Sequence, residues 1–185
     1  MVNQIATASA GPRARTSGVF YLLYFLIAIL AQFFNGRGFT ILGYAANLVA
    51  FGCYIVLTIL FYYLFKPVNR QISIIAAFCS LVGCVLGAIG LFNSSVAQVS
   101  PLFLFGPYCI LLGYLIFRST FLPRMLGVLL VIAGLGWLVY LLPIASHLSS
   151  YIEVLGIVAE GLLMLWLLVK GVNVQRWKEQ AGALQ

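Results

Sequence analysis

The segment Thr40–Phe65, TILGYAANLVAFGCYIVLTILFYYLF, contains no charged side chain. As a helix it is longer than the ~20 residues that are needed to cross the ~30 Å hydrocarbon layer of a membrane. A membrane barrel would instead show segments of ~10 residues with strict alternation of apolar and polar side chains. The segment therefore predicts a transmembrane α-helix.

The composition of the whole chain agrees with this prediction. Of its 185 residues 64% are hydrophobic and 7% are charged, and the mean hydropathy is +1.13. A chain of this size cannot bury so many apolar side chains inside a water-soluble globule. The net charge of +7 does not indicate nucleic-acid binding, because the basic residues stand singly between apolar runs. Membrane lipid is the expected partner, and nucleic acid is not.

Five further apolar segments predict helices at about 18–34, 72–92, 101–117, 125–142 and 151–169. The first is expected to be retained rather than cleaved as a leader, because no small-x-small cleavage site follows it. Together with 40–65 they form an all-α, six-helix transmembrane bundle over residues 18–170. The loops are short, so consecutive helices are expected to be antiparallel neighbours. Residues 1–17 and 171–185 are the predicted tails.

The basic residues sort the loops into two classes. Of the ten lysine and arginine residues, only Arg37 lies in an alternate loop, and the others lie in the tails or after the second and fourth helices. The positive-inside rule therefore places both termini in the cytoplasm, and an even number of spans agrees. The C-terminal tail is expected to lie on the inner membrane surface through Val174 and Trp177.

Small residues line three predicted helices at helical spacing, and such stripes let helices approach closely in lipid. They predict packing within one bundle, with self-association into a homo-oligomer as the alternative. The four cysteines lie in apolar runs without a Cys-x-x-Cys pair or a histidine partner, so we expect packing roles rather than disulfides or a metal site. The stripe residues are Gly43, Ala46, Ala50 and Cys53, then Cys79, Gly83 and Gly87, then Gly127, Gly134 and Gly136.

Two of the three acids, Glu153 and Glu160, lie in the last predicted helix. They are seven residues apart and therefore share one face, with Glu160 ~10 Å deeper, near the membrane midplane. An ionised and unpaired carboxylate is costly there, and no lysine or arginine occurs at that depth. We expect Glu160 to face the bundle interior, uncharged and bonded to a polar neighbour. The candidates are Asn47, Tyr54, Ser80, Tyr108 and Tyr140.

A second polar group is expected near the outer surface. Arg37, Gln32 and His147 are predicted to form an outer-face cluster with Glu153, in which Glu153 pairs with Arg37. This pair is interpreted as a latch between the first outer loop and the last helix, with ligand or proton entry as the alternative. His147, in a short polar loop, is interpreted as a solvated loop residue rather than a relay or ligand.

Three hypotheses for function remain open. In the first, an interior pocket around Glu160 binds or moves a small or lipidic molecule or a proton. In the second, the chain is an intramembrane enzyme in which neutral Glu160 is the general acid on an apolar, isoprenoid-like substrate. In the third, it is a structural or regulatory subunit. Common nucleotide-binding and hydrolase motifs are missing from the sequence, and no cofactor or metal is expected. The ligand-binding candidates besides Glu160 are Glu153, Asn47, Tyr54, Tyr108 and Tyr140, and the enzyme hypothesis adds Trp137.

Three stretches resemble a known family: LFKPVNRQ at 64–71, GPYCILLGYLIFRSTFLPRMLGVLLVIAGLGWLV at 106–139 and AEGLLMLWLLVKGVNVQRWKE at 159–179. They are similar to the bacterial membrane family known as domain of unknown function 4386, and the resemblance covers about Tyr21 to Glu179. It implies a multi-pass protein of the bacterial inner membrane and implies no activity. Glu160 corresponds to an acid typical of the family's last helix. The outer loops after the first and third helices are shorter here than in relatives, so a site built from those loops would be reduced.

Overall fold

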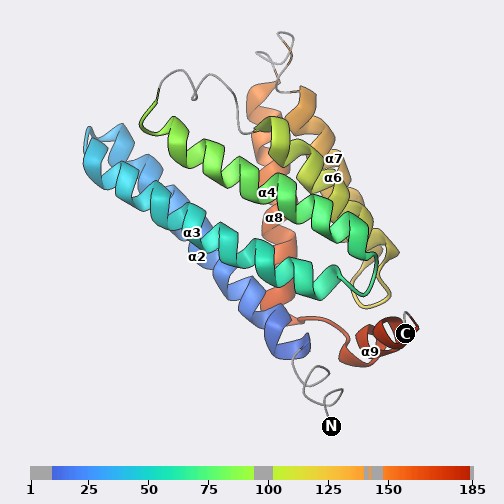
Figure 1. Cartoon of the computed structure of the whole chain (residues 1–185). Coiled ribbons are helices and arrows are strands. Elements are labelled where there is room, and N and C mark those ends of the chain that lie inside the picture. Colours follow the sequence, from blue (N-terminus) through green and yellow to red (C-terminus); the bar gives the residue numbers. More distant parts are fainter. Residues whose placement is uncertain (1–9, 94–101, 140–141, 143–147, 184–185) are drawn as a thin grey trace.

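The computed structural model describes residues 10–93, 102–139, 142 and 148–183. This part of the chain contains seven helices and no strand, so the all-α prediction is confirmed. Figure 1 shows an elongated bundle of helices with a short helix at one end. The helices are α2 (Ala10–Gly36), α3 (Thr40–Phe65), α4 (Arg70–Gly90), α6 (Leu102–Arg118), α7 (Arg124–Val139), α8 (Ser149–Val169) and α9 (Val174–Gly182).

The six long helices close into a ring. Each packs on the helix before it in the chain, and α8 packs on α2. Short turns make the neighbours antiparallel. In the α2–α3 turn Gly38 has a φ of +80°, a left-handed conformation that favours glycine. In the α3–α4 turn the Asn69 side chain accepts a hydrogen bond from the Ile72 N–H at 3.0 Å and so caps α4.

The helices occupy the apolar segments of the sequence, but two of them include residues assigned to the tails. Helix α2 begins at Ala10, upstream of the predicted start at residue 18, and so includes Arg13 and Arg15. Pro12 stands in its first turn, where the absence of a proline N–H breaks no helical hydrogen bond. Helix α9 forms inside the predicted C-terminal tail. The apolar pattern misses both because these residues are polar.

Four helices, α2, α3, α4 and α8, are long and apolar enough to cross a membrane. Helices α6 and α7 are also apolar but have 17 and 16 residues in the described part of the chain. Large apolar side chains, among them Ile41, Phe78 and Val169, are exposed on the outside of the bundle. Such a surface is unfavourable in water and suited to lipid. These features indicate a membrane protein.

Helices α6 and α7 pack with their backbones in contact. A Cβ atom added to Gly113 would lie 2.6 Å from the carbonyl oxygen of Gly127, and one added to Gly134 would lie 2.7 Å from that of Gly106. No larger residue fits at these positions without moving the helices apart. The predicted packing role of Gly127 and Gly134 is therefore confirmed, and their partners on α6 are two further glycines.

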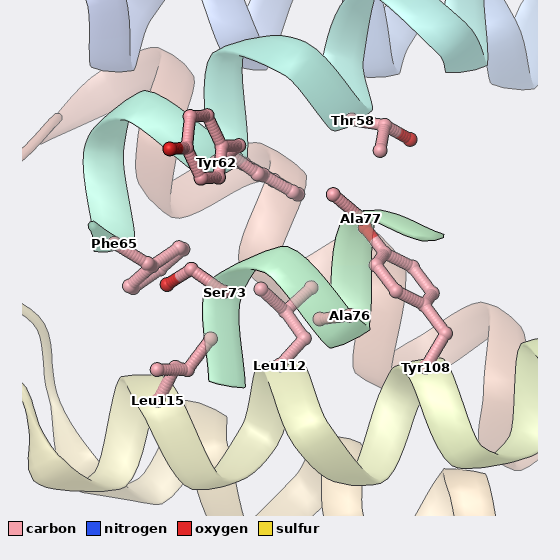
Figure 2. A pocket seen from close by; sticks show the side chains of 10 residues that line it. Thr58, Tyr62, Phe65, Ser73, Ala76, Ala77, Tyr108, Leu112 and Leu115 are labelled. Carbon is pink, nitrogen blue, oxygen red and sulfur yellow. The ribbon is translucent and has the colours of Figure 1, made fainter. Parts of the chain in front are cut away.

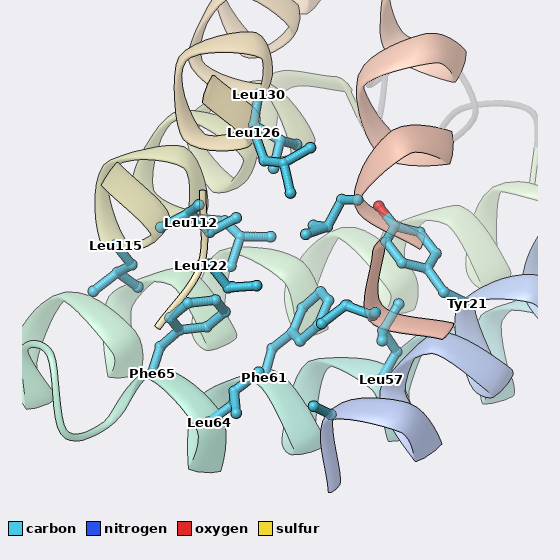
Figure 3. Close-up of a cluster of buried hydrophobic side chains, with 14 of the residues drawn as sticks. Tyr21, Leu57, Phe61, Leu64, Phe65, Leu112, Leu115, Leu122, Leu126 and Leu130 are labelled. Atoms are coloured by element: carbon cyan, nitrogen blue, oxygen red, sulfur yellow. The ribbon is translucent and has the colours of Figure 1, made fainter. Parts of the chain in front are cut away.

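The buried core fills the inside of the ring, with side chains from α2, α3, α4, α6, α7 and α8 (Figure 3). Helix α3 contributes Leu57, Phe61 and Phe65, which are 3% exposed or less. Tyr21 reaches the same cluster from α2 and is also buried. In lipid the burial of apolar side chains against each other yields little hydrophobic free energy, so close packing supplies the stabilisation. The other labelled core residues are Leu64, Leu112, Leu115, Leu122, Leu126 and Leu130.

The C-terminal helix α9 folds back on the bundle. The Trp177 indole N–H donates a hydrogen bond to the Leu64 carbonyl oxygen at 2.9 Å, and the Asn173 N–H donates to that of Phe121 at 3.2 Å. Trp177 is 7% exposed. The sequence interpretation of Trp177 as a surface anchor in lipid is therefore wrong, because its ring is buried in protein and satisfies a carbonyl group at the end of α3.

Candidate functional site

Glu160 is the central residue of the candidate site. Gly156, Leu163 and Leu167 stand at helical spacing from it and are buried, so this face of α8 packs against the bundle. The Glu160 side chain is itself half-buried. The apolar pattern of α8 thus turns the carboxyl group toward the interior.

The partner of this carboxyl group is Tyr21 of α2. The Tyr21 hydroxyl donates a hydrogen bond to Glu160 Oε2 at 2.7 Å, and Tyr21 is 1% exposed. The second carboxyl oxygen, Oε1, is 4.0 Å from the Cys109 Sγ atom of α6. A thiol at this distance is only a weak donor. The acid therefore links α8 to α2 directly and approaches α6.

Among the partners proposed from the sequence, none of those in the described part of the chain has this role. Ser80 forms a hydrogen bond with Thr58, Oγ to Oγ1 at 2.6 Å, and Asn47 donates to the Gly43 carbonyl oxygen on its own helix at 2.9 Å. Tyr54 and Tyr108 are buried, and Tyr140 lies outside the described residues. The expected set left out the first helix, which supplies Tyr21 and which meets α8 only when the ring closes.

The sequence contains one signal that could have identified Tyr21 as the partner, namely its distance from the basic end of its helix. Tyr21 stands about two helical turns after Arg13, while Glu160 stands about three turns before Lys170. If these bases mark one end of the bundle, the hydroxyl and the carboxyl group are at similar depth. That comparison requires knowing that α2 and α8 are neighbours, which hydropathy alone does not tell.

Aromatic rings pack against the Tyr21 ring in the bundle interior. The Tyr21 and Tyr54 ring centroids are 6.2 Å apart with an edge-to-face arrangement, and the Tyr24 and Tyr54 centroids are 4.7 Å apart. Phe61 lies 6.0 Å from Tyr21, also edge-to-face. Such pairs are attractive and hold the rings in place. The Tyr54 ring therefore helps to hold Tyr21, the hydrogen-bond partner of Glu160, in position.

Helices α2 and α8 meet closely at one end and separate toward the other. A Cβ atom on Gly18 would lie 2.8 Å from the backbone nitrogen of Leu168, so the two backbones are in contact there. The Tyr21–Glu160 hydrogen bond follows about one turn further along α2. Figure 1 shows the two helices crossing near the start of α2 and diverging toward the other end of α2. The site thus has a closed end.

A crevice of about 430 Å³ begins where these helices separate. Its walls come from α2, α3, α7 and α8, and Glu160 lines it together with two other polar side chains, Gln32 and Asn47. No lysine or arginine is among the described residues that line it. The apolar and aromatic lining includes Tyr24, Phe25, Ile29, Phe51, Trp137 and Ile157. The crevice is therefore a mostly apolar space with a carboxyl group near its closed end.

The Trp137 indole forms one wall of this crevice. It packs on Gly156 of α8, where an added Cβ atom would lie 2.5 Å from the ring atom Cζ2. Gly156 is therefore needed to let the ring pack this closely against α8. This contact fixes the width of the crevice between α7 and α8.

The residues of the predicted outer-face cluster do not all line one site in the described part of the chain. Gln32 lines the crevice, whereas Arg37 lies in the α2–α3 turn with its guanidinium carbon 4.5 Å from the Phe33 ring centroid. Glu153 is exposed on α8, and its pairing with Arg37 stays a prediction. His147 lies outside the described residues.

Tyr108 belongs to a different, smaller cavity. It lies with Ser73 beside a space of about 10 Å³ between α3, α4 and α6 (Figure 2). The Tyr108 hydroxyl and Ser73 Oγ are buried and have no hydrogen-bond partner within the described part of the chain. Tyr108 is therefore separated from the crevice that contains Glu160.

The described residues contain no group of three or more histidine, cysteine, aspartate or glutamate side chains that could hold a metal ion. Cys53, Cys79, Cys84 and Cys109 are all free thiols. Of these four, Cys109 approaches the Glu160 carboxyl group. The described residues that line the crevice offer one carboxyl group, hydroxyl and amide groups, and aromatic rings.

Comparison with known proteins adds a family but no activity. An uncharacterized protein of Archaeoglobus fulgidus is 28% identical over 117 residues, which are 60% of this chain and 72% of that protein. No solved structure matches the chain. Residues 16–98 and 92–171 match the family described as a domain of unknown function, DUF4386. These two stretches cover most of the chain, including the six helices of the ring from residue 16 of α2 onward and the residues of the crevice, so the chain belongs to the DUF4386 family.

Proposed function

We propose that this protein is a six-span membrane bundle that binds a small amphipathic or lipidic molecule in the crevice beside Glu160. Both termini are in the cytoplasm in this proposal, and the membrane is the bacterial inner membrane. Support comes from the four long apolar helices and the two shorter ones. It also comes from the basic residues, which gather at the end of the bundle where both tails lie. The crevice then opens toward the outer half of the bilayer.

The observation that carries the proposal is the position of the Tyr21–Glu160 pair at the closed end of a crevice of about 430 Å³. Ligand sites in proteins are typically concave, mostly apolar and of ~300–1,000 Å³, with a few polar groups that fix orientation. This crevice fits that description. An acid inside a membrane protein is also a functional candidate in its own right.

The lining defines the chemistry of the ligand. With no base among the described lining residues, the Glu160 carboxyl group is most stable uncharged, because an unpaired carboxylate is costly away from water. An uncharged carboxyl group donates one hydrogen bond while the Tyr21 hydroxyl occupies its other oxygen. The expected ligand has a hydroxyl or carbonyl group at one end and an apolar body against Phe25, Phe51 and Trp137.

The closed end favours binding over passage. Backbone contact between Gly18 and Leu168 seals the crevice below Glu160, and the packed core lies behind Tyr21. A molecule in the crevice can therefore leave only by the side from which it entered, and it cannot pass through the bundle. The enzyme hypothesis is supported less well, because Trp137 lines the crevice but two of its other aromatic candidates, Tyr54 and Tyr108, do not.

Mass spectrometry of molecules that copurify with the protein tests the proposal. The wild type is expected to retain at least one species of which Glu160→Gln and Tyr21→Phe retain about tenfold less, since each variant removes a buried polar contact. Glu153→Gln is the matched control, because Glu153 is on the same helix but exposed. A wild-type protein without a bound species, or equal amounts in all variants, would contradict the proposal.

A further inference from the structure

A second hollow lies at the end of the bundle where α2 begins and α9 docks. Its volume is about 490 Å³, and three basic residues line it: Arg13 from α2, Lys66 from the α3–α4 turn and Arg70 from the start of α4. Tyr63 and Trp177 add two aromatic rings. We call this hollow the basic pocket. Because its residues are far apart in the sequence, it exists only in the folded chain.

The aromatic walls of the basic pocket are held in place. The Trp177 indole is fixed by its hydrogen bond to the Leu64 carbonyl oxygen at 2.9 Å. The Arg13 guanidinium carbon lies 5.7 Å from the Tyr63 ring centroid, within the range of a cation–π contact. Arg13 is half-buried, so its charge is held against the bundle. The folded chain thus gives the pocket a defined shape.

The charge of the basic pocket is not balanced by its own lining. No carboxylate is among the described residues that line it, and Glu179 of α9 lines a different hollow with Thr120 and Arg176. Like charges that converge on one space repel each other, and an anion between them removes that repulsion. The pocket is therefore suited to a negatively charged group.

The surface beside the basic pocket is apolar. Ile59 stands one turn before Tyr63 on α3, and both side chains are exposed. In the membrane placement proposed above, this strip faces acyl chains while the three bases lie at the level of the headgroups. A ligand with charge at one end and a hydrocarbon chain at the other satisfies both surfaces. Inorganic phosphate satisfies only the first.

We propose that the basic pocket binds the phosphate headgroup of an anionic phospholipid, whose acyl chains run along the strip formed by Ile59 and Tyr63. This inference rests on the membrane placement of the proposed function and is independent of the Glu160 crevice. Because α9 supplies Trp177 to the pocket, a bound lipid also holds the tail helix on the bundle.

Native mass spectrometry of the full chain in detergent tests this inference. The probes are dioleoyl-phosphatidylglycerol, dioleoyl-phosphatidylcholine and inorganic phosphate, each added separately and in competition. The wild type is expected to bind phosphatidylglycerol in preference to phosphatidylcholine. The triple variant Arg13→Gln, Lys66→Gln and Arg70→Gln is expected to bind phosphatidylglycerol ~100-fold more weakly, about fivefold for each base removed.

A second triple variant, Arg118→Gln, Arg124→Gln and Lys178→Gln, is the matched control. It removes the same charge from the same end of the bundle but none of the residues that line the basic pocket. It is expected to keep the wild-type affinity. Equal loss in both triple variants would overturn the inference, as would equal binding of the two lipids. Full displacement of phosphatidylglycerol by an equal concentration of inorganic phosphate would overturn the lipid assignment.

Two further measurements keep the result interpretable. Near-ultraviolet circular dichroism checks that the first triple variant is folded, and the single variant Arg70→Gln, expected to lose about fivefold, replaces it otherwise. Carbonate extraction of membranes tests the membrane placement on its own. Release of the chain contradicts both proposals, whereas a retained chain without a preference for phosphatidylglycerol contradicts only this one. The Glu160→Gln variant is expected to bind phosphatidylglycerol normally.

Discussion

Ser73 and Ser80 are two buried serines of α4 whose hydroxyl groups meet different surroundings. Ser80 donates to Thr58 Oγ1 at 2.6 Å, and Thr58 in turn donates to the Tyr54 carbonyl oxygen at 2.8 Å. Ser73 Oγ has no partner within the described residues. The Ser80 hydroxyl joins α4 to α3, while the Ser73 hydroxyl is buried without a hydrogen bond to any residue that the structure describes.

Alanine substitution of these serines is expected to give different results. Ser80→Ala should lower the free energy of unfolding by about 0.5–1.5 kcal/mol, because it removes an interhelical hydrogen bond. Ser73→Ala should leave it unchanged or raise it, because it removes a buried hydroxyl that lacks a partner. The measurement is unfolding of the purified protein in detergent, followed by circular dichroism. A larger loss for Ser73→Ala than for Ser80→Ala would contradict the hydrogen-bond assignment.

Glu160 shows how far residue-level reasoning extends. Its importance follows from chemistry that needs no structure, since an acid in an apolar helix must find shelter from lipid. Its partner does not follow in the same way, because a tyrosine is compatible with lipid contact, an interface position or a hydrogen bond. Only contact between α2 and α8 distinguishes Tyr21 from the other tyrosines of the chain.

At the level of the helices, glycine positions decide how closely neighbours pack. Gly113 and Gly127 face each other across the α6–α7 contact, where an added Cβ atom would lie 2.5–2.6 Å from a carbonyl oxygen. Gly52 and Gly161 are also helical, but an added Cβ atom there meets nothing within 4 Å. The same residue type thus has two different roles in one chain.

Glycine-to-alanine variants separate these roles. Gly113→Ala and Gly127→Ala are expected to destabilise the bundle by about 1–3 kcal/mol, because the clash involves backbone atoms and the helices must separate. Gly52→Ala and Gly161→Ala are expected to be neutral or to stabilise it by up to about 1 kcal/mol, because alanine favours the helix. Thermal unfolding in detergent provides the comparison. Similar losses in all four variants would show that the α6–α7 backbones are not in contact.

The position and docking of helix α9 cannot be predicted from an apolar pattern. Its residues are mostly polar, so neither its position nor its docking is visible in hydropathy. The Trp177 ring suits a lipid interface equally well when the sequence is considered alone. The hydrogen bond to Leu64 and the burial of the ring decide between these two environments.

For the whole molecule, the closed ring of helices brings the first and last segments together. Contact between α2 and α8 forms the Tyr21–Glu160 pair, and contact between α2 and α9 brings Gly11 close to Val174. The start of α2 and helix α9 therefore lie at the same end (Figure 1). An even number of spans requires the same arrangement.

Cysteine labelling in intact cells tests the proposed orientation. Phe39→Cys in the α2–α3 turn is expected to react with a membrane-impermeant maleimide added outside, whereas Thr120→Cys in the α6–α7 turn is expected to react only after permeabilisation. Both side chains are exposed and uncharged, so neither change alters the distribution of basic residues. The unsubstituted chain controls for the four native cysteines. Outside labelling of Thr120→Cys would reverse the proposed topology.

The order of amino acids alone was enough to predict an all-helical chain and to single out Glu160. Both depend on free energies of transfer between water and lipid, which are properties of each segment or side chain. The partner of Glu160, the closed end at Gly18, the glycine contacts of α6 and the docking of Trp177 depend on which helices become neighbours. That choice is made by shape and backbone approach among helices of nearly equal hydropathy, so it becomes visible only when the folded chain places them side by side.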